Sequence, residues 1–521
     1  MAKIKGTGLS RRTVVAGLMA GAAAGWLELG GAANALTTRT RYDLKTPQGR
    51  AALVLYRQAV AKMQALPESD PLSWAFQANI HAHPYSQDQA RAIFASAPPA
   101  NRSLALGANS DGVGGIWWTC SHGHANLDGS PVDNYAAHFT AWHRLYLWHF
   151  ERICEKVLGQ PFALPYWNYL DLTQLKLPPE VLKEKLRINR KWTNNALFFP
   201  DRRPDFVNNG LRAINGDPGD TDILAKDTMK TKGFFDLSTS TGSFRQGFVA
   251  ALDQTPHGSV HVRVGTDDGM GMGAFESAAR DPIFWLHHAN IDRLWESWRV
   301  PGATGTSTKD PKSPKASVWL DRAFTFAGID GLASVKTARD SLSLPGLGYQ
   351  YDRLQPIGII AFAAPNAEVS VLKVTTLTET PSGDGAVVGQ GNAPVTMTLA
   401  PAVPADKLKT LAQDGGNQFW LVIDVETAKN PNSLFQILVK VKKSVSNPVL
   451  VNQPVQTFNL FNAGMHARHG MSYKTAWQVD ISDLVRTSRL DLSKPLEVTV
   501  RPVAGDSSGL VTVHHMRVEA Q

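Results

Sequence analysis

The placement of histidine constrains this chain more than any other feature of its 521 residues. Eleven of the fifteen histidines lie between residues 81 and 288, none lies between 289 and 465, and four follow. Five of the eleven fall within residues 120–152 and four within residues 255–295. Imidazoles gathered in this way are typical ligands of transition metals. We therefore expect a metal site in the first part of the chain.

The spacing of the later histidines fits a helix. His257 and His261 are four residues apart, so on a helix they share one face and can bind one ion, and Pro256 suits a first helical turn. His287 and His288 are adjacent. Because neighbours on a helix diverge by about 100°, only one of them is expected to face a shared ion.

The first thirty-five residues predict an export signal. They combine basic residues, a Gly/Ala-rich apolar stretch and a small-residue cleavage pattern at Ala33 and Ala35. Ser10 followed by Arg11 and Arg12 resembles a twin-arginine signal, which predicts a periplasmic or secreted protein. An ordinary secretory signal or an uncleaved anchor is the alternative.

Composition excludes several classes of partner. After residue 35 no stretch reaches the eighteen apolar residues of a membrane helix, so no membrane segment is expected in the mature protein. Basic residues are not interleaved with aromatics in runs, which argues against nucleic acid as a partner. Two cysteines allow one disulfide bridge but no disulfide framework.

The apolar periodicity divides the chain into two parts. Residues 49–66, 142–158 and 281–299 have helical spacing, whereas seven short runs after residue 366 alternate with a period of two. We expect a mainly α domain at 36–350, a linker at 351–365 and an all-β sandwich domain at 366–521, after the signal at 1–35.

The chain contains three motifs, "FTAWHRLYLWHFE", "HGSVH" and "DPIFWLHHANIDRLW". Together they resemble those of the type-3 copper proteins, which comprise tyrosinases, catechol oxidases and haemocyanins. "LGYQYDRL" at 347–354 resembles the Tyr-x-Tyr signature that closes the catalytic domain of plant and bacterial relatives, and the β-rich remainder is similar to the C-terminal domain of polyphenol oxidases. The resemblance implies a four-helix-bundle dicopper core with long loops, and two copper ions per chain that are each held by three histidines.

The resemblance also implies small phenolic substrates and O2 as partners. In relatives the C-terminal domain shields the active site or aids assembly. The resemblance therefore leaves latency and homo-oligomerisation open for this chain.

For the second copper, the resemblance carries over to His257, His261 and His288, with Asp292 following on the same segment. It makes His287 a neighbouring imidazole that packs beside the ligands rather than binding the ion.

For the first copper, the matching positions are His143, in "FTAWHR", and His81, in "FQANIH", with His83 a bystander. Relatives usually place the middle ligand nine residues before the "WHR" histidine, but this chain has Asn134 there. A common bacterial motif, C-x-H-G, fits "CSHG" with twelve extra residues after the histidine, which favours His122. The alternatives for the middle ligand are His138 and His124.

Cys120 precedes His122 by two residues, as in relatives whose cysteine forms a thioether with the middle histidine. A reduced thiol or a bridge to Cys154 is the alternative. Phe139 and Phe284 resemble the aromatic residues that pack against the ligand rings of the family.

Six neutral imidazoles suit an ion that cycles between Cu(I) and Cu(II), whereas carboxylate-rich sites favour harder ions. The predicted reaction is oxidation of catechols to o-quinones with O2, together with tyrosinase-type ortho-hydroxylation of monophenols. An oxygen-binding protein like haemocyanin, or another metal enzyme that uses part of the cluster, is the alternative.

Four further residues are expected at the reaction site. In the family, the residues after the second copper's histidines guide the phenol, and here they are Gly258 and Val262. Asp253 is placed to hold a water, but Gly258 supplies no amide to work with it, so catechol oxidation is favoured over hydroxylation. Phe275 either covers the copper site as a gate or packs in the core.

Overall fold

The computed structural model describes most of the chain beyond the predicted signal, and Arg39–Gln521 form one compact unit. The described residues are 38–121, 138–211, 225–231, 234, 237–238, 244–245, 247–266, 270–299, 319–355, 375–381, 385–388, 393–414, 417–428, 434–461, 463, 472–504 and 511–520. The predicted export signal, the linker after residue 355, His122 and His124 lie outside these ranges.

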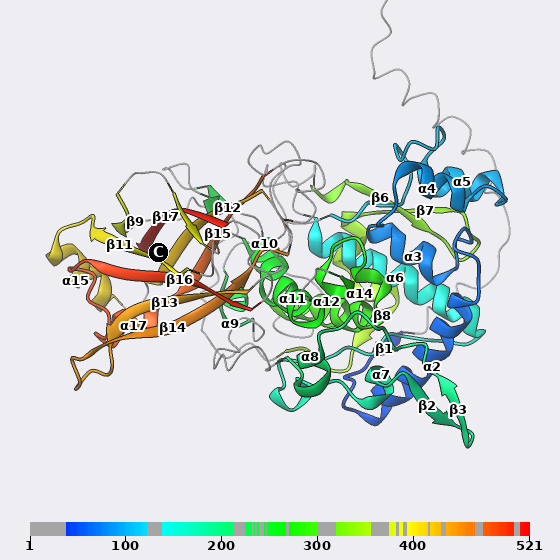
Figure 1. Ribbon diagram of the computed structural model, residues 1–521, viewed down its shortest axis with the longest axis horizontal. Helices are drawn as coiled ribbons and strands as arrows, with labels where there is room; N and C mark the ends of the chain where they lie inside the picture. Colours follow the sequence, from blue (N-terminus) through cyan, green and yellow to red (C-terminus); the bar gives the residue numbers. More distant parts are fainter. Residues whose placement is uncertain are drawn as a thin grey trace, which may run out of the picture. The chain divides into compact units, whose positions relative to one another are not determined.

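The first part is mainly helical, as the periodicity predicts (Figure 1). Its principal helices are α2 (Pro47–Gln64), α3 (Trp74–His81), α6 (Phe139–Leu158) and α12 (Ile283–Arg299). Shorter helices are α4 (Gln87–Ile93), α5 (Pro99–Leu106), α7 (Pro179–Leu182), α8 (Pro204–Asn209), α9 (Lys226–Lys230) and α14 (Leu344–Leu347). Helix α6 packs against both α2 and α12, so it is the centre of this part.

Local signals set the ends of these helices. The Thr46 hydroxyl accepts a hydrogen bond from the Gly49 amide at the start of α2, and Pro47 occupies the first helical turn. The Asp281 carboxylate accepts from the Ile283 amide and so caps α12. Gly159 ends α6 with a φ of 74°, a conformation that suits glycine.

The segment that carries His257 and His261 is an interrupted helix. It runs through α10 (Phe248–Leu252), a π-type turn η2 (Asp253–Gly258) and α11 (Ser259–Val264). Thr255, before Pro256, has a non-helical φ of −140°, because a proline disfavours the helical conformation of the residue before it. His257 therefore follows the kink and lies with His261 on the far side of it, where Pro256 is expected in a first helical turn.

The second part is all-β, as predicted. Among the described residues its strands are β9 (Thr375–Glu379), β10 (Ala386–Val388), β11 (Val395–Pro401), β12 (Phe419–Thr427), β13 (Leu434–Lys442), β14 (Leu450–Asn459), β15 (Tyr473–Asp480), β16 (Leu496–Ala504) and β17 (Val511–Ala520). They form one sheet in the order β14-β13-β16-β11-β9-β17-β12-β15, with β10 beside β17. Helices α15 (Ala405–Gln413) and α17 (Ser482–Arg486) accompany it.

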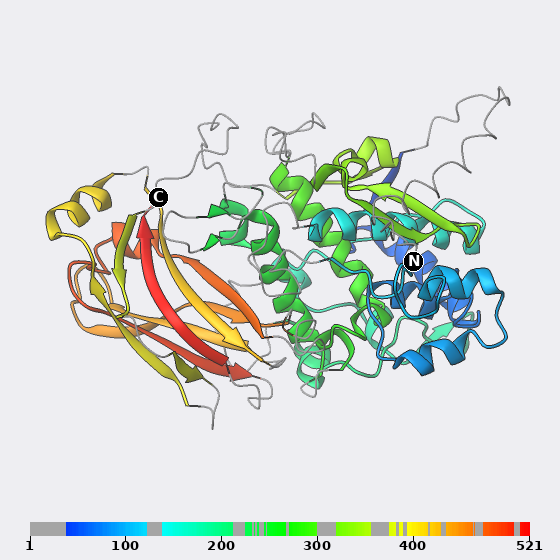
Figure 2. The same cartoon turned by 90° about the horizontal axis from the view of Figure 1, so that it is seen from above.

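The layers of the expected sandwich are two halves of this single curled sheet. Strand β11 pairs with β16 through one portion and with β9 through the other, so it belongs to both halves. The long strands curve visibly (Figure 2), and the two halves enclose one apolar core. Pro454 lies in β14, an edge strand, where a missing amide hydrogen costs no ladder bond on the open side.

A buried charge network fastens the helical part around Asp292 of α12. Arg144 of α6 and Arg41 both form ion pairs with the Asp292 carboxylate, and the hydroxyls of Tyr349 and Tyr351 donate to it at 2.6 Å. Burial alone would raise the pKa of Asp292, but Arg144 and Arg41 lower it below its ordinary value.

Pairing of two short strands brings this network together. Strand β1 (Arg39–Arg41) pairs in parallel with β8 (Tyr349–Tyr351), so the start of the described chain and the Tyr-x-Tyr signature meet beside α6 and α12. Arg41 also pairs with Glu151 of α6, at 2.7 Å. Because α6 carries His143 and α12 carries His288, this network sets the relative position of the two helices.

We predict that Asp292→Asn destabilises the protein by about 3–5 kcal/mol, since it leaves two buried arginines without their shared carboxylate. Urea unfolding followed by circular dichroism measures the change. The control is Arg339→Gln, which breaks an exposed pair with Asp321 and should cost less than about 1 kcal/mol. Equal losses for the two variants would contradict the assigned role of the network.

Candidate metal centre

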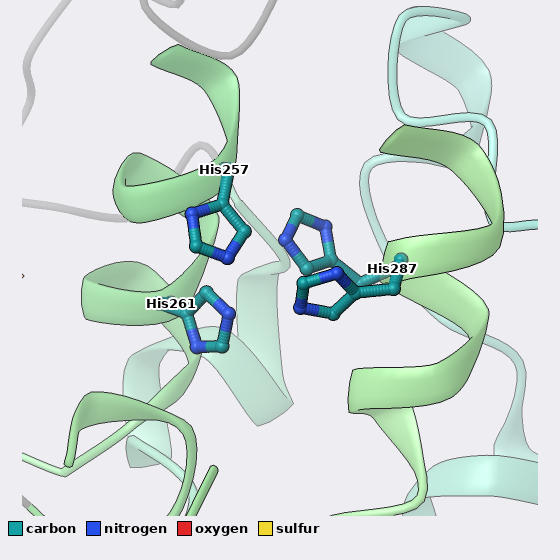
Figure 3. Close-up of side chains that lie close together, drawn as sticks. His257, His261 and His287 are labelled. Atoms are coloured by element: carbon teal, nitrogen blue, oxygen red, sulfur yellow. The ribbon is translucent and has the colours of Figure 1, made fainter. Parts of the chain in front are cut away.

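Four buried imidazoles form the larger cluster of the helical part. One ligating atom from each of His257, His261, His287 and His288 lies within 4.8 Å of the others. The first two come from the interrupted helix and the last two from α12, which faces it (Figure 3). The segments that the sequence motifs single out therefore converge in space.

His287 lies in this cluster beside His288. The His287 ring lies 5.2 Å from the His261 ring, and its Nδ1 is 3.1 Å from the Tyr169 hydroxyl. The His288 ring instead stacks on the His143 ring, with the centroids 4.4 Å apart. The two side chains leave α12 in different directions, yet one ligating atom of each lies within the cluster.

A second group adjoins the first and contains His81, Cys120 and His143, again with one ligating atom from each within 4.8 Å. His81 ends α3 and His143 lies in the second turn of α6. The Cys120 sulfur is 3.4 Å from Nε2 of His143. Stacking of His143 on His288 places the two groups side by side.

The candidates for the middle position of this second group differ in where they lie. His122 and His124 fall outside the described residues. His138 is described, and its Nε2 lies 3.1 Å from the Trp319 carbonyl oxygen, while its ring stacks on the Trp319 indole. Its imidazole is therefore engaged with Trp319 and is not a member of either cluster.

Backbone carbonyls orient three of the predicted ligands. Nδ1 of His143 lies 2.8 Å from the Phe139 carbonyl oxygen, and Nδ1 of His261 lies 2.8 Å from that of Met272. Nδ1 of His257 lies 2.8 Å from the Asp253 carbonyl oxygen. An imidazole that donates through Nδ1 keeps the lone pair of Nε2 for a metal, so these contacts select the ligating tautomer.

Aromatic rings fill the space around the imidazoles, as predicted. The Phe139 ring centroid is 4.7 Å from those of His143 and His257, and the Phe284 centroid is 4.1 Å from that of His288. Phe275 is fully buried and lies 4.6 Å from the His81 ring. These rings pack directly against imidazoles of both groups.

Of the predicted substrate-side residues, Asp253 contacts the larger cluster directly. Asp253 is fully buried, with its carboxylate 3.0 Å from Nδ1 of His257. Val262 is buried on α11. A side chain at Gly258 would collide with Asn459, since a Cβ there would stand 2.3 Å from its Oδ1.

Two residues at the cluster come from the C-terminal sheet and escaped the sequence analysis. The Phe461 ring stacks on the His261 ring with centroids 4.1 Å apart, and it belongs to the helical core rather than to the sheet core. Asn459, at the end of β14, donates from Nδ2 to the Gln254 carbonyl and the Ser259 hydroxyl. No motif marks either residue, because they lie about two hundred positions from the segment that they contact.

Burial favours the neutral form of three of the four clustered imidazoles. It lowers the pKa of His261, His287 and His288 well below the ordinary value, and neighbouring histidines lower it further. Neutral imidazoles are the form that binds a metal at neutral pH. Burial also raises the pKa of the Cys120 thiol, with a smaller contribution from Asp253.

The unused nitrogen atoms fit a bound cation. Nε2 of His261, Nε2 of His287 and both ring nitrogens of His288 are buried without a hydrogen-bond partner among the described residues. Buried polar atoms are normally paired. His149, a buried histidine of the same helix as His143, has both nitrogens engaged, by the Leu145 carbonyl and the Ser334 hydroxyl. A metal ligand must keep one ring nitrogen free of protein partners, and within the described part of the chain His261, His287 and His288 do so whereas His149 does not.

Comparison with known proteins agrees with this geometry. Residues 71–300 match the model of the common central domain of tyrosinase. The chain is 27% identical to tyrosinase HcTyr1 of Hahella sp. (strain CCB-MM4), over 87% of this chain and 91% of the relative. It is 24% identical to chloroplastic (+)-larreatricin hydroxylase of Larrea tridentata, over 89% and 75% of the two chains.

The fold is also similar to a solved structure of latent aurone synthase, a polyphenol oxidase. The TM-score is 0.59 at 19% identity, with 94% of this chain and 90% of that chain covered. Residues 71–300 match a tyrosinase central domain, and these relatives together support a copper-dependent, phenol-oxidising enzyme of the tyrosinase and polyphenol oxidase kind. These enzyme relatives do not favour the alternative of an oxygen carrier.

Copper should stabilise the protein, because it binds the folded site and not the unfolded chain. At free copper about one hundred times the dissociation constant, each site adds about 2.7 kcal/mol. We predict that chelation lowers the unfolding temperature in calorimetry, and that Cu²⁺ restores it while Mg²⁺ does not. An unfolding temperature that is the same with and without copper would contradict the metal centre.

Proposed function

We propose that the enzyme oxidises catechols to o-quinones with O2 at two coppers held by the six histidines that the sequence motifs identify. The proposed ligands are His81, His122 and His143 for the first ion and His257, His261 and His288 for the second. The observation that carries this proposal is the stacking of His143 on His288, which brings two compact groups of buried imidazoles side by side.

The chain's own residues prepare the site for this chemistry. When bound, a copper pair supplies two one-electron redox centres that together take two electrons from a catechol and pass them to O2. The carbonyls of Phe139 and Met272 hold two imidazoles in one tautomer, and Phe284 keeps water from the rings. Ligands that are already oriented need little rearrangement as the ions change oxidation state.

His287 is proposed to position a ligand rather than to bind copper. The Tyr169 hydroxyl lies 3.1 Å from its Nδ1, and its ring stacks on that of His257. His288, whose ring stacks on that of His143, is the proposed ligand of the pair. A loss of copper in His287→Ala as large as in His288→Ala would assign the ligand role to both.

Hydroxylation of monophenols is proposed to be the weaker activity. It requires a base for the phenol proton, and Asp253 already contacts Nδ1 of His257. Gly258 offers no side-chain amide to orient a water beside that carboxylate. Oxygen uptake on paired monophenol and diphenol substrates measures the ratio of the two activities.

Cys120 is proposed to form a thioether with the middle histidine of the first copper. Its sulfur lies at this group, 3.4 Å from Nε2 of His143, which supports a place beside the ion. Cys154 is buried in the core and stays a free thiol in this proposal. Titration of thiols in the unfolded, copper-matured protein should then find one reactive thiol. Two reactive thiols would show that no crosslink forms.

We predict that His257→Ala, His261→Ala and His288→Ala each lower the copper content from two ions per chain toward one. Catechol oxidation should fall by more than the roughly 10- to 100-fold that changes outside the ligand set cause. Elemental analysis of the purified protein gives the copper content.

The matched control for these variants is His149→Ala. This histidine is also buried on a helix of the centre, but it bonds only to protein groups. It should retain two coppers even if the variant is less stable. Copper loss in the control to the same extent would reassign the effect to general destabilisation.

The C-terminal sheet is proposed to keep the full-length enzyme latent. The Phe461 ring covers the face of His261 as a phenol ring would, and it is buried there. Asn459 holds the end of β14 against the metal centre, since it donates hydrogen bonds to Gln254 and Ser259 on either side of His257. Gly258 leaves the room that Asn459 needs.

Around the inserted Phe461, the contact between the sheet and the helical part includes polar interactions that suit reversible separation. Lys230 of α9 pairs with Asp480 of β15 at 2.6 Å, and Gln254 donates to the Thr475 hydroxyl at 2.6 Å. A cavity of about 20 Å³ lies between them, and polar atoms of Trp420 and Trp477 on its lining have no partner among the described residues. A cavity of that size holds about one water molecule. Interfaces of this polar kind permit relative motion.

We predict that Asn459→Ala raises catechol oxidation by the uncleaved enzyme. Loss of two hydrogen bonds of about 1 kcal/mol each shifts the closed-to-open equilibrium by about tenfold or more. Phe461→Ala should raise activity as well, because it uncovers His261 without requiring the sheet to move. Oxygen uptake at saturating catechol, before and after limited proteolysis, measures both effects.

Asn452→Ala is the matched control, since Asn452 lies exposed on the same strand and away from the site. It should remain as latent as the parent. The shielding proposal is wrong if all three variants match the parent before proteolysis and gain equally after it.

Export across a membrane to the periplasm or beyond is proposed from the N-terminal segment alone. No helix in the described part of the chain is long and apolar enough to cross a bilayer. The homo-oligomeric state stays a prediction.

A further inference from the structure

A basic hairpin stands apart from the metal centre and has no part in the chemistry proposed above. Strands β2 (Lys185–Ile188) and β3 (Lys191–Asn194) pair with each other and with no other described strand. The hairpin projects beside α7 (Figure 1). Within residues 183–191 the chain has five cations and one carboxylate, Glu184. The cations are Lys183, Lys185, Arg187, Arg190 and Lys191.

The charge of this hairpin is not neutralised by its own protein. No ion pair joins any of the five cations to a carboxylate in the described part of the chain, and all five are exposed. The nearby Glu180 pairs with Arg50 instead. A concentration of unpaired cations on a small projecting element attracts an anionic partner.

The register gathers cations and an aromatic ring on one face. Lys185 pairs with Asn194 and Arg187 with Trp192, and directly opposed residues in an antiparallel pair lie on the same face. Trp192 is 71% exposed. The opposite face carries Leu186 and Ile188, which are half-buried, opposite Thr193 and Lys191, which are exposed. Lys185, Arg187 and Trp192 are therefore the cations and the ring that share one face, and Lys191 adds its charge from the other side of the hairpin.

The tip of the hairpin places a cation where glycine is the usual residue. Asn189 and Arg190 form the two-residue loop with φ values of 48° and 67°. Such turns prefer Asn-Gly, because a residue with a side chain rarely adopts the second conformation. Arg190 therefore extends the positive charge to the outermost point of the hairpin.

We propose that this hairpin binds the surface of an anionic phospholipid bilayer. Lysine and arginine side chains reach the phosphate groups, while an exposed tryptophan suits the boundary between head groups and acyl chains. A soluble acidic protein would match the charge but would not require an isolated, exposed indole beside it. The association is peripheral and involves no spanning segment.

The test is co-sedimentation of the mature, copper-loaded enzyme with vesicles. The enzyme should bind vesicles of phosphatidylglycerol and phosphatidylcholine, fail to bind pure phosphatidylcholine, and be released as salt screens the charges. Replacing Lys185, Arg187, Arg190 and Lys191 by Gln should weaken binding about tenfold or more. Trp192→Ala should weaken it less and leave its salt dependence intact.

A charge-matched variant with Lys407, Lys409, Lys443 and Lys494 changed to Gln serves as the control and should bind like the parent. Catechol oxidation after proteolysis should be equal in all variants, which verifies that each is folded. Equal loss of binding in the two quadruple variants would overturn the proposal by assigning the effect to net charge. Competition by heparin with no preference for vesicles would overturn it by assigning the site to soluble polyanions.

Discussion

The buried carboxylate of Asp292 is the interaction on which the metal centre depends. It joins two arginines and two tyrosines from three separate segments, β1, α6 and β8, so α6 and α12 are held at one fixed distance. His143 precedes Arg144 by one residue on α6, and His288 precedes Asp292 by one helical turn on α12. An arrangement that tethers the two ligand helices just beside their ligands supplies the rigidity that a pair of neighbouring ions requires.

The same centre is also where the two parts of the protein meet. Phe461 packs in the helical core although it follows a strand of the C-terminal sheet, and Asn459 fills the space left by Gly258. The polar contacts around this insertion contrast with the dense aromatic packing behind the imidazoles. Strong packing preserves the site while the weaker polar contact permits the cover to leave. This difference explains how one fold combines a preformed centre with latency.

Much of this architecture was predictable from local sequence patterns, and the remainder was not. Apolar periodicity predicts α2, α6 and α12 to within three residues at either end, and the motifs predict the meeting of His143 with His288. The spacing of His257 and His261 concerns only residues after the kink at Thr255, so it does not predict the π-type turn that joins them to α10. The role of Phe461 depends on how the curled sheet docks, which no short pattern encodes.

Anomalous diffraction at the copper edge tests the central claim most directly. From a copper-loaded crystal the account predicts two peaks of similar height, one contacted by Nε2 of His257, His261 and His288 and the other by the imidazoles of His81 and His143. A single peak, or a peak that His143 does not contact, would contradict the dicopper centre.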